Sequence, residues 1–220
     1  MRLIIVRHGE TKLNKEGRIQ GQLCNSDFTE RGLKQIEKVI NKLKKYSIGS
    51  IFSCDTLRCL KIAEKIAKLK KISNFIDQRL RSRTWGILDG KTRGEIARLF
   101  PDSGYNIKGK TTDQGKKYYF KPPQGETWFE AVRRIEEFVK DFLKNYYSKN
   151  TVVIVGHSGV CRAMITYLCS LEKFTLIGKP IDNVTFNIFN IKKQKDNRFL
   201  IFNFSFLFKY KKTFFNILQV

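Results

Sequence analysis

The sequence predicts an α/β fold in three layers, α/β/α, with a mainly parallel central sheet covered by helices on both faces. Short apolar runs such as Arg2–Val6 and Thr151–Val155 alternate along the chain with longer segments whose apolar residues recur every three or four positions. Continuous apolar runs are typical of strands buried on both faces, and their alternation with helices is typical of parallel sheets. The 220 residues suffice for one domain with a complete core.

The first half of the chain is expected to contain three strands and two helices. Segment Glu30–Tyr46 has apolar residues at helical spacing, and Thr29 before it is a candidate N-cap. A second helix, capped by Asp55 or Thr56, is expected to end near Leu69. The residues expected to face the core from the first helix are Leu33, Ile36, Val39, Ile40 and Leu43. The strands of this half are expected at Arg2–Val6, Ser50–Ser53 and Ser73–Ile76.

The second half begins with a short helix expected at Thr92–Phe100, which Pro101 ends. Residues 102–121 are polar and basic and show no clear period, so we expect a long loop that serves as a lid. No linker or repeat divides the chain, and residues 1–220 are therefore expected to form one domain with this lid inserted at about 102–121. Helices are expected at Glu126–Tyr147 and Ser158–Ser170, and strands at Thr151–Val155, Val184–Ile191 and Arg198–Phe206. The Phe- and Lys-rich tail after Phe206 receives no assignment.

The charge of the chain indicates its partners. The formal net charge is +23 at pH 7, and a basic patch can bind nucleic acid, anionic lipid or phosphorylated substrates, so such a field would attract a phosphorylated small molecule. The excess is mostly lysine scattered along the chain beside many Ile, Phe, Asn and Tyr residues, a mixture typical of compositional bias. Because no nucleic-acid-binding motif accompanies it, nucleic acid is not expected as a partner.

The apolar runs and the cysteines indicate a cytoplasmic location. No apolar run approaches the roughly 18–20 residues of a membrane helix, so no membrane partner is expected. The N-terminus turns polar after Val6, unlike a signal peptide. The five cysteines are odd in number and lack CxxC spacing, so we expect reduced thiols, without a disulfide framework or a zinc site. Cys161 and Cys169 are expected to pack along one helix. The oligomeric state is left open, a homodimer included.

The only two histidines, His8 and His157, each follow a predicted buried strand and each stand beside glycine. Because ligands of such sheets bind beyond the carboxyl ends of the strands, we expect the two imidazoles to act as a pair. Arg7 offers a planar fork of donors suited to phosphate oxygens. A neutral imidazole beside it can attack phosphorus and divide phosphoryl transfer into two steps. Gly9 permits a tight turn with close backbone approach.

These motifs together resemble the histidine phosphatase superfamily, in its phosphoglycerate-mutase-like branch. The resemblance begins at Arg7–Thr11 with Asn14. It continues through Gln20-Gly21, Asp27–Gly32, Ser53–Arg58, Trp85–Gly90, Pro122–Thr127 and Gly156–Gly159, and so covers most of the chain. Segments Asn14–Glu16, Ile19–Gln22 and Gly125–Thr127 are most similar to TIGAR-type fructose-bisphosphate phosphatases and to broad-specificity bacterial phosphatases.

The resemblance implies a role for each matched residue. His8 would be the nucleophile, and Arg7, Arg58 and a cationic His157 would clamp the phosphoryl group. The residues that would complete the phosphate pocket are Asn14, Gln20, Gly21, Ser158 and Gly159; the last two open a helix and offer backbone N–H groups. The family needs neither metal nor cofactor, so none is expected.

One position departs from the family pattern. Ser82 stands where the family usually carries the glutamate that protonates the leaving oxygen. A hydroxyl is a poor acid near neutral pH, and losing general acid–base help costs about 10²–10⁴ in rate. Three explanations stay open: a weak enzyme or an engineered trap of the phosphoenzyme, a substitute carboxylate, or a pseudoenzyme that binds phosphorylated ligands without turnover. The candidate substitutes are Glu10, Asp89 and Glu126, although Glu126 is equally interpretable as a residue that holds its loop. Cys59 and Ile62, where the family commonly has Ala and Thr, are interpreted as packing changes.

The segment after the second histidine favours a phosphatase over a mutase. Mutases of this family usually carry Gly-Asn-Ser there and longer insertions, whereas this chain has Ser158-Gly159-Val160. We therefore expect a phosphomonoesterase acting on a small phosphorylated metabolite through phosphohistidine at His8, with a phosphoglycerate mutase as an alternative. The lysines that can contact a second phosphate of a sugar bisphosphate, or simply be solvated, are Lys108, Lys110, Lys116 and Lys117.

Overall fold

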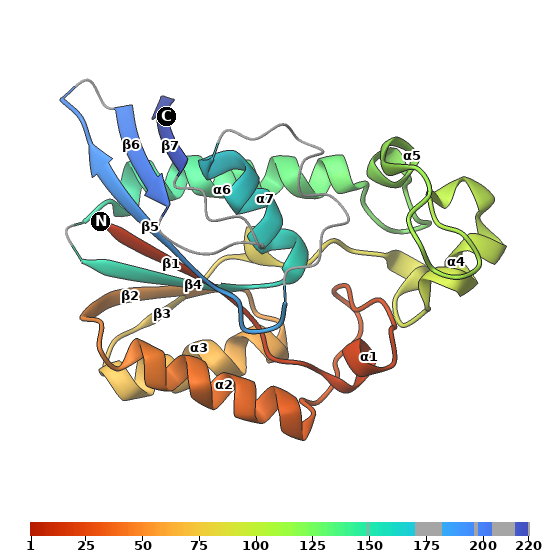
Figure 1. The fold of residues 1–220 in the computed structure, drawn as a ribbon, viewed down its shortest axis with the longest axis horizontal. Coiled ribbons are helices and arrows are strands. Elements are labelled where there is room, and N and C mark those ends of the chain that lie inside the picture. The colour runs from red at the N-terminus through yellow and green to blue at the C-terminus, as the bar shows by residue number, and fades with distance from the viewer. Residues whose placement is uncertain (149, 170–181, 196–197, 204–213, 220) are drawn as a thin grey trace.

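The computed structural model describes residues 1–148, 150–169, 182–195, 198–203 and 214–219, in which seven strands form one sheet (Figure 1). The strand order is β3-β2-β4-β1-β5-β6-β7. Four strands run parallel: β1 (Arg2–Arg7), β2 (Ile48–Ser53), β3 (Asn74–Ile76) and β4 (Thr151–Gly156). Three more extend the sheet by antiparallel pairing: β5 (Phe186–Lys193), β6 (Arg198–Asn203) and β7 (Phe214–Gln219).

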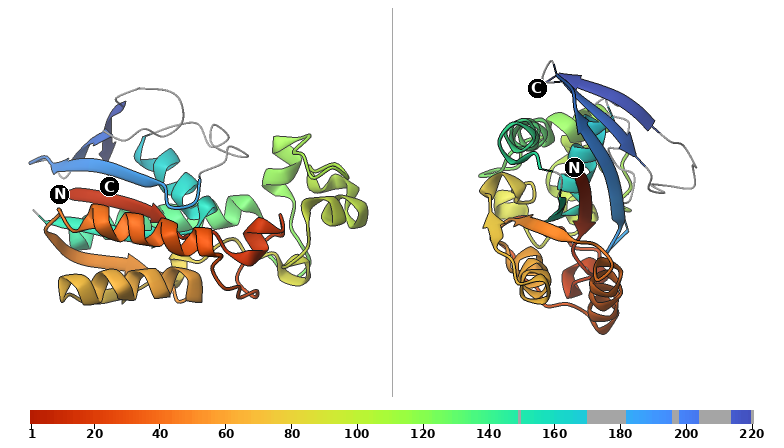
Figure 2. Two further views of the ribbon diagram at one scale, coloured as in Figure 1. Left: turned by 60° about the horizontal axis from the view of Figure 1, so that its bottom comes forward. Right: turned by 90° about the vertical axis from the view of Figure 1, so that its left-hand side faces the viewer.

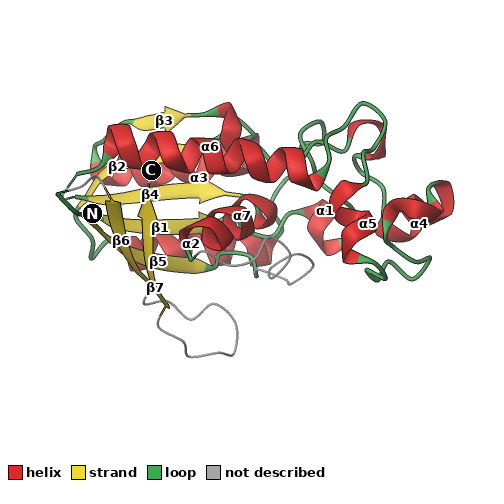
Figure 3. Ribbon diagram, turned by 90° about the horizontal axis from the view of Figure 1, so that it is seen from above, coloured by secondary structure: helices red, strands yellow, loops and turns green. Residues whose placement is uncertain are grey.

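Helices cover both faces of the sheet, which confirms the three-layer prediction. Helices α2 (Glu30–Leu43) and α3 (Leu57–Lys70) lie on one face, and α6 (Trp128–Tyr146) and α7 (Ser158–Leu168) lie on the other (Figures 2 and 3). The sheet is mixed, because β5 to β7 are antiparallel, but the half that carries both histidines is parallel as predicted. Strand β7 lies in the tail that received no assignment. The predicted ends at Ser170 and at residues 204–206 lie outside the described residues.

Threonine caps explain where the main helices begin. The Thr29 side chain accepts a hydrogen bond from the Gly32 N–H at 3.0 Å, so α2 starts where predicted. Helix α6 starts at Trp128 rather than at residue 126, because Thr127 caps it and Glu130 closes a capping box. Of the residues expected in the core from α2, Ile36, Val39 and Leu43 are buried and Ile40 is partly buried, whereas Leu33 is 44% exposed.

Residues 102–121 are not the long loop that the composition predicted. Helix α4 (Arg93–Leu99) leads into a 3₁₀ turn at Pro101–Ser103, and α5 (Gln114–Tyr119) follows, capped by Asp113. Tyr118 is buried in the main core. A single buried aromatic residue does not create the repeating apolar spacing from which a helix is predicted. With the one-turn α1 (Lys12–Lys15), α4 and α5 form the part of the molecule beyond the carboxyl ends of the parallel strands (Figure 1).

The core is continuous through the parallel half of the sheet. All of β4 and four successive residues of β1, Leu3–Val6, are buried, as expected for strands covered on both faces. Cys161 is buried on α7, and Cys169 packs against the same core where that helix ends, as predicted. Within the described residues, none of the helices combines the length and the apolar character needed to cross a bilayer.

Candidate active site

The sheet brings the two histidines together, as expected from their positions after strands. Strands β1 and β4 are neighbours, with Arg7 opposite Gly156, and the His8 N–H donates to the Gly156 carbonyl at 3.0 Å. The imidazole centroids of His8 and His157 lie 5.3 Å apart with an interplanar angle of 67°. Both side chains are buried.

The surroundings of His8 select its protonation state. Its Nδ1 lies 2.8 Å from the Gly9 carbonyl oxygen, which can only accept, so Nδ1 carries the proton and Nε2 keeps the lone pair. Burial, followed by repulsion from His157 whenever that ring is protonated and by the charges of Arg58 and Arg7, holds the pKa of His8 well below its usual value. His8 is therefore a neutral imidazole at pH 7. Gly9 is required here, because a Cβ would lie 2.7 Å from the Gly32 carbonyl oxygen.

His157 is also neutral, which corrects the cationic role expected for it in the free protein. The Arg58 Nε donates to His157 Nδ1 at 3.2 Å, so the ring proton is on Nε2. That Nε2 lies 3.2 Å from both Thr56 Oγ1 and Cys54 Sγ. Burial first, and then Arg58, lower the pKa of His157 to about 4. Positive charge in this site is therefore carried by arginines and not by the imidazoles.

A cavity of about 780 Å³ opens beside the histidines. The predicted site residues that line it are Arg7, His8, Asn14, Gln20, Ser82, His157, Ser158 and Gly159. Gly21 and Arg58 do not line it. Gly21 instead packs against Asp89, where a Cβ would lie 2.6 Å from a carboxylate oxygen. Eight of the ten predicted residues therefore share one cavity, although they come from distant segments of the chain.

Arg58 lies behind His157 rather than on the cavity wall. Only 2% of it is exposed, and its Nη2 donates to the carbonyl oxygens of Gly21 at 2.6 Å and Gln20 at 3.4 Å. Its Nη1 lies 3.5 Å from the Cys24 carbonyl oxygen. Arg58 thus links the 20–24 loop to His157, and its direct contact with phosphate stays a prediction.

Asn183 is a cavity residue that no sequence motif indicated. Its side-chain N–H₂ donates to the His8 carbonyl oxygen at 3.1 Å and lies 3.4 Å from Asn14 Oδ1. It lies just before β5, and the antiparallel pairing of β5 with β1 brings it to the histidine loop. Because this placement depends on strand pairing, a local pattern could not have revealed it.

Of the three candidate carboxylates, only Glu10 lines the cavity. Asp89 accepts from the backbone N–H groups of Gly21 and Leu23 and so shapes the 20–24 loop. Glu126 accepts from the Thr84 N–H at 3.0 Å and from Arg134 at 2.6 Å, which agrees with its loop-holding interpretation.

Glu10 is itself tethered within the site. Its carboxylate accepts from Thr29 Oγ1 at 2.8 Å and lies 3.6 Å from an Arg31 nitrogen. Ser82, at the position of the family's acid, lines the cavity and brings only a hydroxyl. Within the described residues, Glu10 is therefore the one carboxylate on the cavity wall.

A second group of cations lies on the wall of the same cavity. Arg83, Arg93, Lys117 and Arg162 line it around Tyr105, and Lys117 Nζ lies 5.2 Å from the centre of the Tyr105 ring. Burial, followed by the charges of Arg162, Arg93 and Arg83, lowers the pKa of Lys117 to about 7. Such a depressed pKa marks a place where an anion would be stabilising.

Of the four lysines considered for a second phosphate, two line the cavity and two do not. Lys110 and Lys117 line the cavity, whereas Lys108 does not and Lys116 forms an ion pair with Asp102 at 2.7 Å. Arg93 and Arg162 were missed. They stand in ordinary helical segments, and only the approach of α4 and α7 to one cavity distinguishes them from surface cations.

Comparisons with known proteins agree with this geometry. The family model described as histidine phosphatase superfamily (branch 1) matches residues 3–203. Phosphoserine phosphatase 1 of Hydrogenobacter thermophilus is 27% identical over 198 residues, which cover 89% of each chain. Fructose-2,6-bisphosphatase TIGAR of Xenopus tropicalis is 35% identical over 140 residues, or 62% of this chain and 47% of the relative, so the match spans about half of that protein. Among solved structures, Bacillus stearothermophilus YhfR superposes with a TM-score of 0.73 at 25% identity, covering 87% of this chain and 91% of the other.

Proposed function

The chain belongs to the histidine phosphatase superfamily (branch 1), and we propose that it is a phosphomonoesterase that acts on a small phosphorylated metabolite through a phosphohistidine at His8. The observation that carries this proposal is the state of His8. Its Nδ1 is committed to the Gly9 carbonyl, its pKa is low, and it lines the cavity, so a neutral Nε2 is the available nucleophile.

In the first step, the His8 Nε2 lone pair attacks phosphorus, the P–N bond forms, and the bond to the leaving oxygen breaks. In the second step, water attacks the phosphohistidine and frees inorganic phosphate. Charge on the transferring oxygens is stabilised by Arg7 and by the N–H groups of Ser158 and Gly159 in the first turn of α7. Arg58 orients His157 and holds the 20–24 loop, from which Gln20 reaches the cavity.

The leaving oxygen needs a proton, and the site is weakly equipped to supply one. Ser82 cannot act as an acid near pH 7, and Asp89 and Glu126 are bound to backbone N–H groups away from the cavity. Glu10, which lines the cavity, is the remaining candidate for the proton donor to the leaving oxygen. The same observation at Ser82 favours a second candidate function, in which the protein binds a phosphorylated ligand without turning it over.

The distribution of charge supports a substrate with two anionic groups. The phosphoryl group would lie beside His8, and a second phosphate or a carboxylate would lie against Arg93, Lys117 and Arg162. Phosphoserine and fructose 2,6-bisphosphate, which the names of the relatives specify, both combine a phosphate with a second anion. We retain residues 102–121 as a proposed lid, because Tyr105, Lys110 and Lys117 reach the cavity from this segment.

Rapid quenching with a ³²P-labelled substrate tests the mechanism. Wild type is expected to retain acid-labile, base-stable label on His8, and His8→Ala is expected to retain none. His157→Ala is the matched control, since it removes the other buried imidazole and leaves the nucleophile in place. Label on His8→Ala at the wild-type level would contradict the proposal, and turnover by wild type would exclude the pure binding function.

A further inference from the structure

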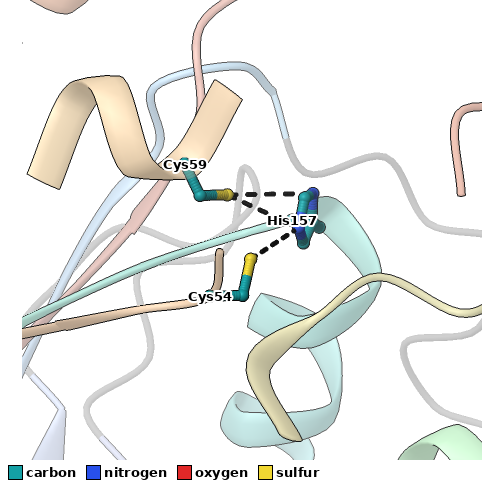
Figure 4. Close-up of side chains that lie close together, drawn as sticks. All are labelled: Cys54, Cys59 and His157. Atoms are coloured by element: carbon teal, nitrogen blue, oxygen red, sulfur yellow. Dashed lines mark hydrogen bonds between the residues drawn. The ribbon is translucent and has the colours of Figure 1, made fainter. Parts of the chain in front are cut away.

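Two thiols lie against His157, one member of the histidine pair, in a buried cluster (Figure 4). Cys54 directly follows β2, Cys59 lies in the first turns of α3, and His157 precedes α7. From His157 Nε2, the distance to Cys54 Sγ is 3.2 Å and to Cys59 Sγ 3.4 Å. One ligand atom from each residue lies within 4.8 Å of the other two, and all three side chains are buried.

This arrangement has the composition and the size of a zinc site. Zn²⁺ binds thiolate sulfur at about 2.3 Å and imidazole nitrogen at about 2.0 Å, so its tetrahedral ligands lie roughly 3.5–3.8 Å from one another. The sulfur–nitrogen distances here are already close to that spacing. Thr56 Oγ1, at 3.0 Å from Cys54 Sγ and 3.2 Å from His157 Nε2, adds an oxygen beside two of the three ligand atoms.

We propose that Cys54, Cys59 and His157 form a Zn²⁺ site, with Thr56 or water as the fourth ligand, and that its occupation inhibits phosphoryl transfer. Thiolate ligands select soft and borderline ions such as Zn²⁺ over Mg²⁺ or Ca²⁺. Two thiolates balance the ion's charge, so the occupied site adds no net charge beside Arg58. The site goes beyond the proposed phosphatase function, which needs no metal.

The chemistry of binding explains the inhibition. Two S–H bonds break and release their protons to water, and two Zn–S bonds and one bond to His157 Nε2 form. The ring proton now on Nε2 must then move to Nδ1, where it faces the Nε–H donor of Arg58. Zinc therefore breaks the Arg58–His157 hydrogen bond and with it the link between His157 and the 20–24 loop.

Co²⁺ binding measures the site without any assay of activity. Reduced wild type is expected to bind one equivalent with a thiolate-to-cobalt charge-transfer band, which Zn²⁺ displaces. Cys59→Ala and Cys54→Ser are expected to lose the band and to bind Zn²⁺ more weakly by at least the roughly 10–100-fold that loss of an outer-shell partner costs. Cys161→Ala is the matched control, because it removes an equally buried helical thiol outside the cluster. No band in wild type, or an unchanged band in both cluster variants, overturns the site.

The inhibitory consequence rests on the proposed phosphatase function and has a separate readout. Zn²⁺ is expected to inhibit wild type reversibly, with recovery on chelation, and to inhibit Cys59→Ala only at concentrations about 10-fold higher or more. Equal inhibition of the two proteins overturns this part. If no phosphatase activity exists, the cobalt spectra still decide whether the metal site does. Thermal unfolding of Cys59→Ala checks its fold, and Cys54→Ser provides the second variant.

Discussion

The imidazole rings of His8 and His157 lie 5.3 Å apart because β1 and β4 pair in register, with Arg7 opposite Gly156. One nitrogen of each ring is oriented by a hydrogen bond, to the Gly9 carbonyl for His8 and from the Arg58 guanidinium for His157. Both rings are neutral in the free protein. This pair therefore combines a nucleophile with a polar neighbour, and the arginines carry the charge.

Replacing Ser82 by glutamate is expected to restore the missing acid. Ser82→Glu should raise kcat for an alkyl phosphate about 10²-fold, because the position lines the cavity, and should change aryl phosphate hydrolysis little, because aryl leaving groups need less protonation. Steady-state kinetics on both substrates measure the difference. Ser82→Gln, of equal size without a proton to give, is the control, and an equal gain in both variants would rule out acid catalysis.

The same pair of substrates tests Glu10 as the present donor. Glu10→Gln should lower alkyl phosphate turnover about 10²-fold in an otherwise wild-type protein and spare the aryl phosphate. Asp89→Asn, which disturbs only the 20–24 loop, is expected to affect both substrates alike. Unchanged alkyl turnover in Glu10→Gln would exclude Glu10 as the donor.

Lys117 is expected to make binding of a doubly anionic substrate depend on pH. Its low pKa, about 7, means that the free protein loses this positive charge above pH 7 while a bound anion favours the protonated form. KM for a bisphosphate should therefore rise between pH 7 and 9, by up to about tenfold per pH unit. Lys117→Arg, which stays charged, should flatten this rise, and a monophosphate should not show it. If KM for the bisphosphate depends on pH in the same way in Lys117→Arg and in wild type, Lys117 does not bind the second anion.

Arg58 is expected to control the titration of His157. Because Arg58 is the second largest cause of the low pKa of His157, after burial, Arg58→Met should move that pKa upward from about 4. With only two histidines in the chain, NMR titration resolves both rings. The pKa of His8 should move less, because Arg58 ranks only third among the causes of its low pKa, after burial and His157. If the titration gives the same His157 pKa in Arg58→Met and in wild type, Arg58 does not contribute to that low pKa.

The buried histidines should make the fold sensitive to acid. For His157 the folded-state pKa of about 4 lies below the unfolded value near 6.5, so the unfolded chain binds more protons between these values. The stability that this group contributes is present above pH 6.5 and is lost as pH falls toward 4. The free energy of unfolding of wild type, measured in urea, should fall by about 1–2 kcal/mol between pH 7 and pH 5 because of this group. His157→Gln should lose less over this range, and an equal loss would assign the effect to other groups.

The sequence by itself determined the elements that local chemistry controls. Apolar runs predicted β1 and β4, and the candidate cap Thr29 predicted where α2 starts. The placement of His8 and His157 after two strands sufficed to predict that they meet. These features depend on hydrogen bonding and burial within a few residues, or on the rule that parallel strands end at one edge.

Only the tertiary structure decided which side chains share a space. Arg58 donates to the 20–24 loop, Asn183 reaches the His8 carbonyl, and Cys54 and Cys59 surround His157, although no pattern along the chain connects them. The long stretch 102–121 folds around buried Tyr105 and Tyr118 for the same reason. These contacts arise from strand order and helix packing between distant segments, and periodicity and spacing along the chain do not encode such distances.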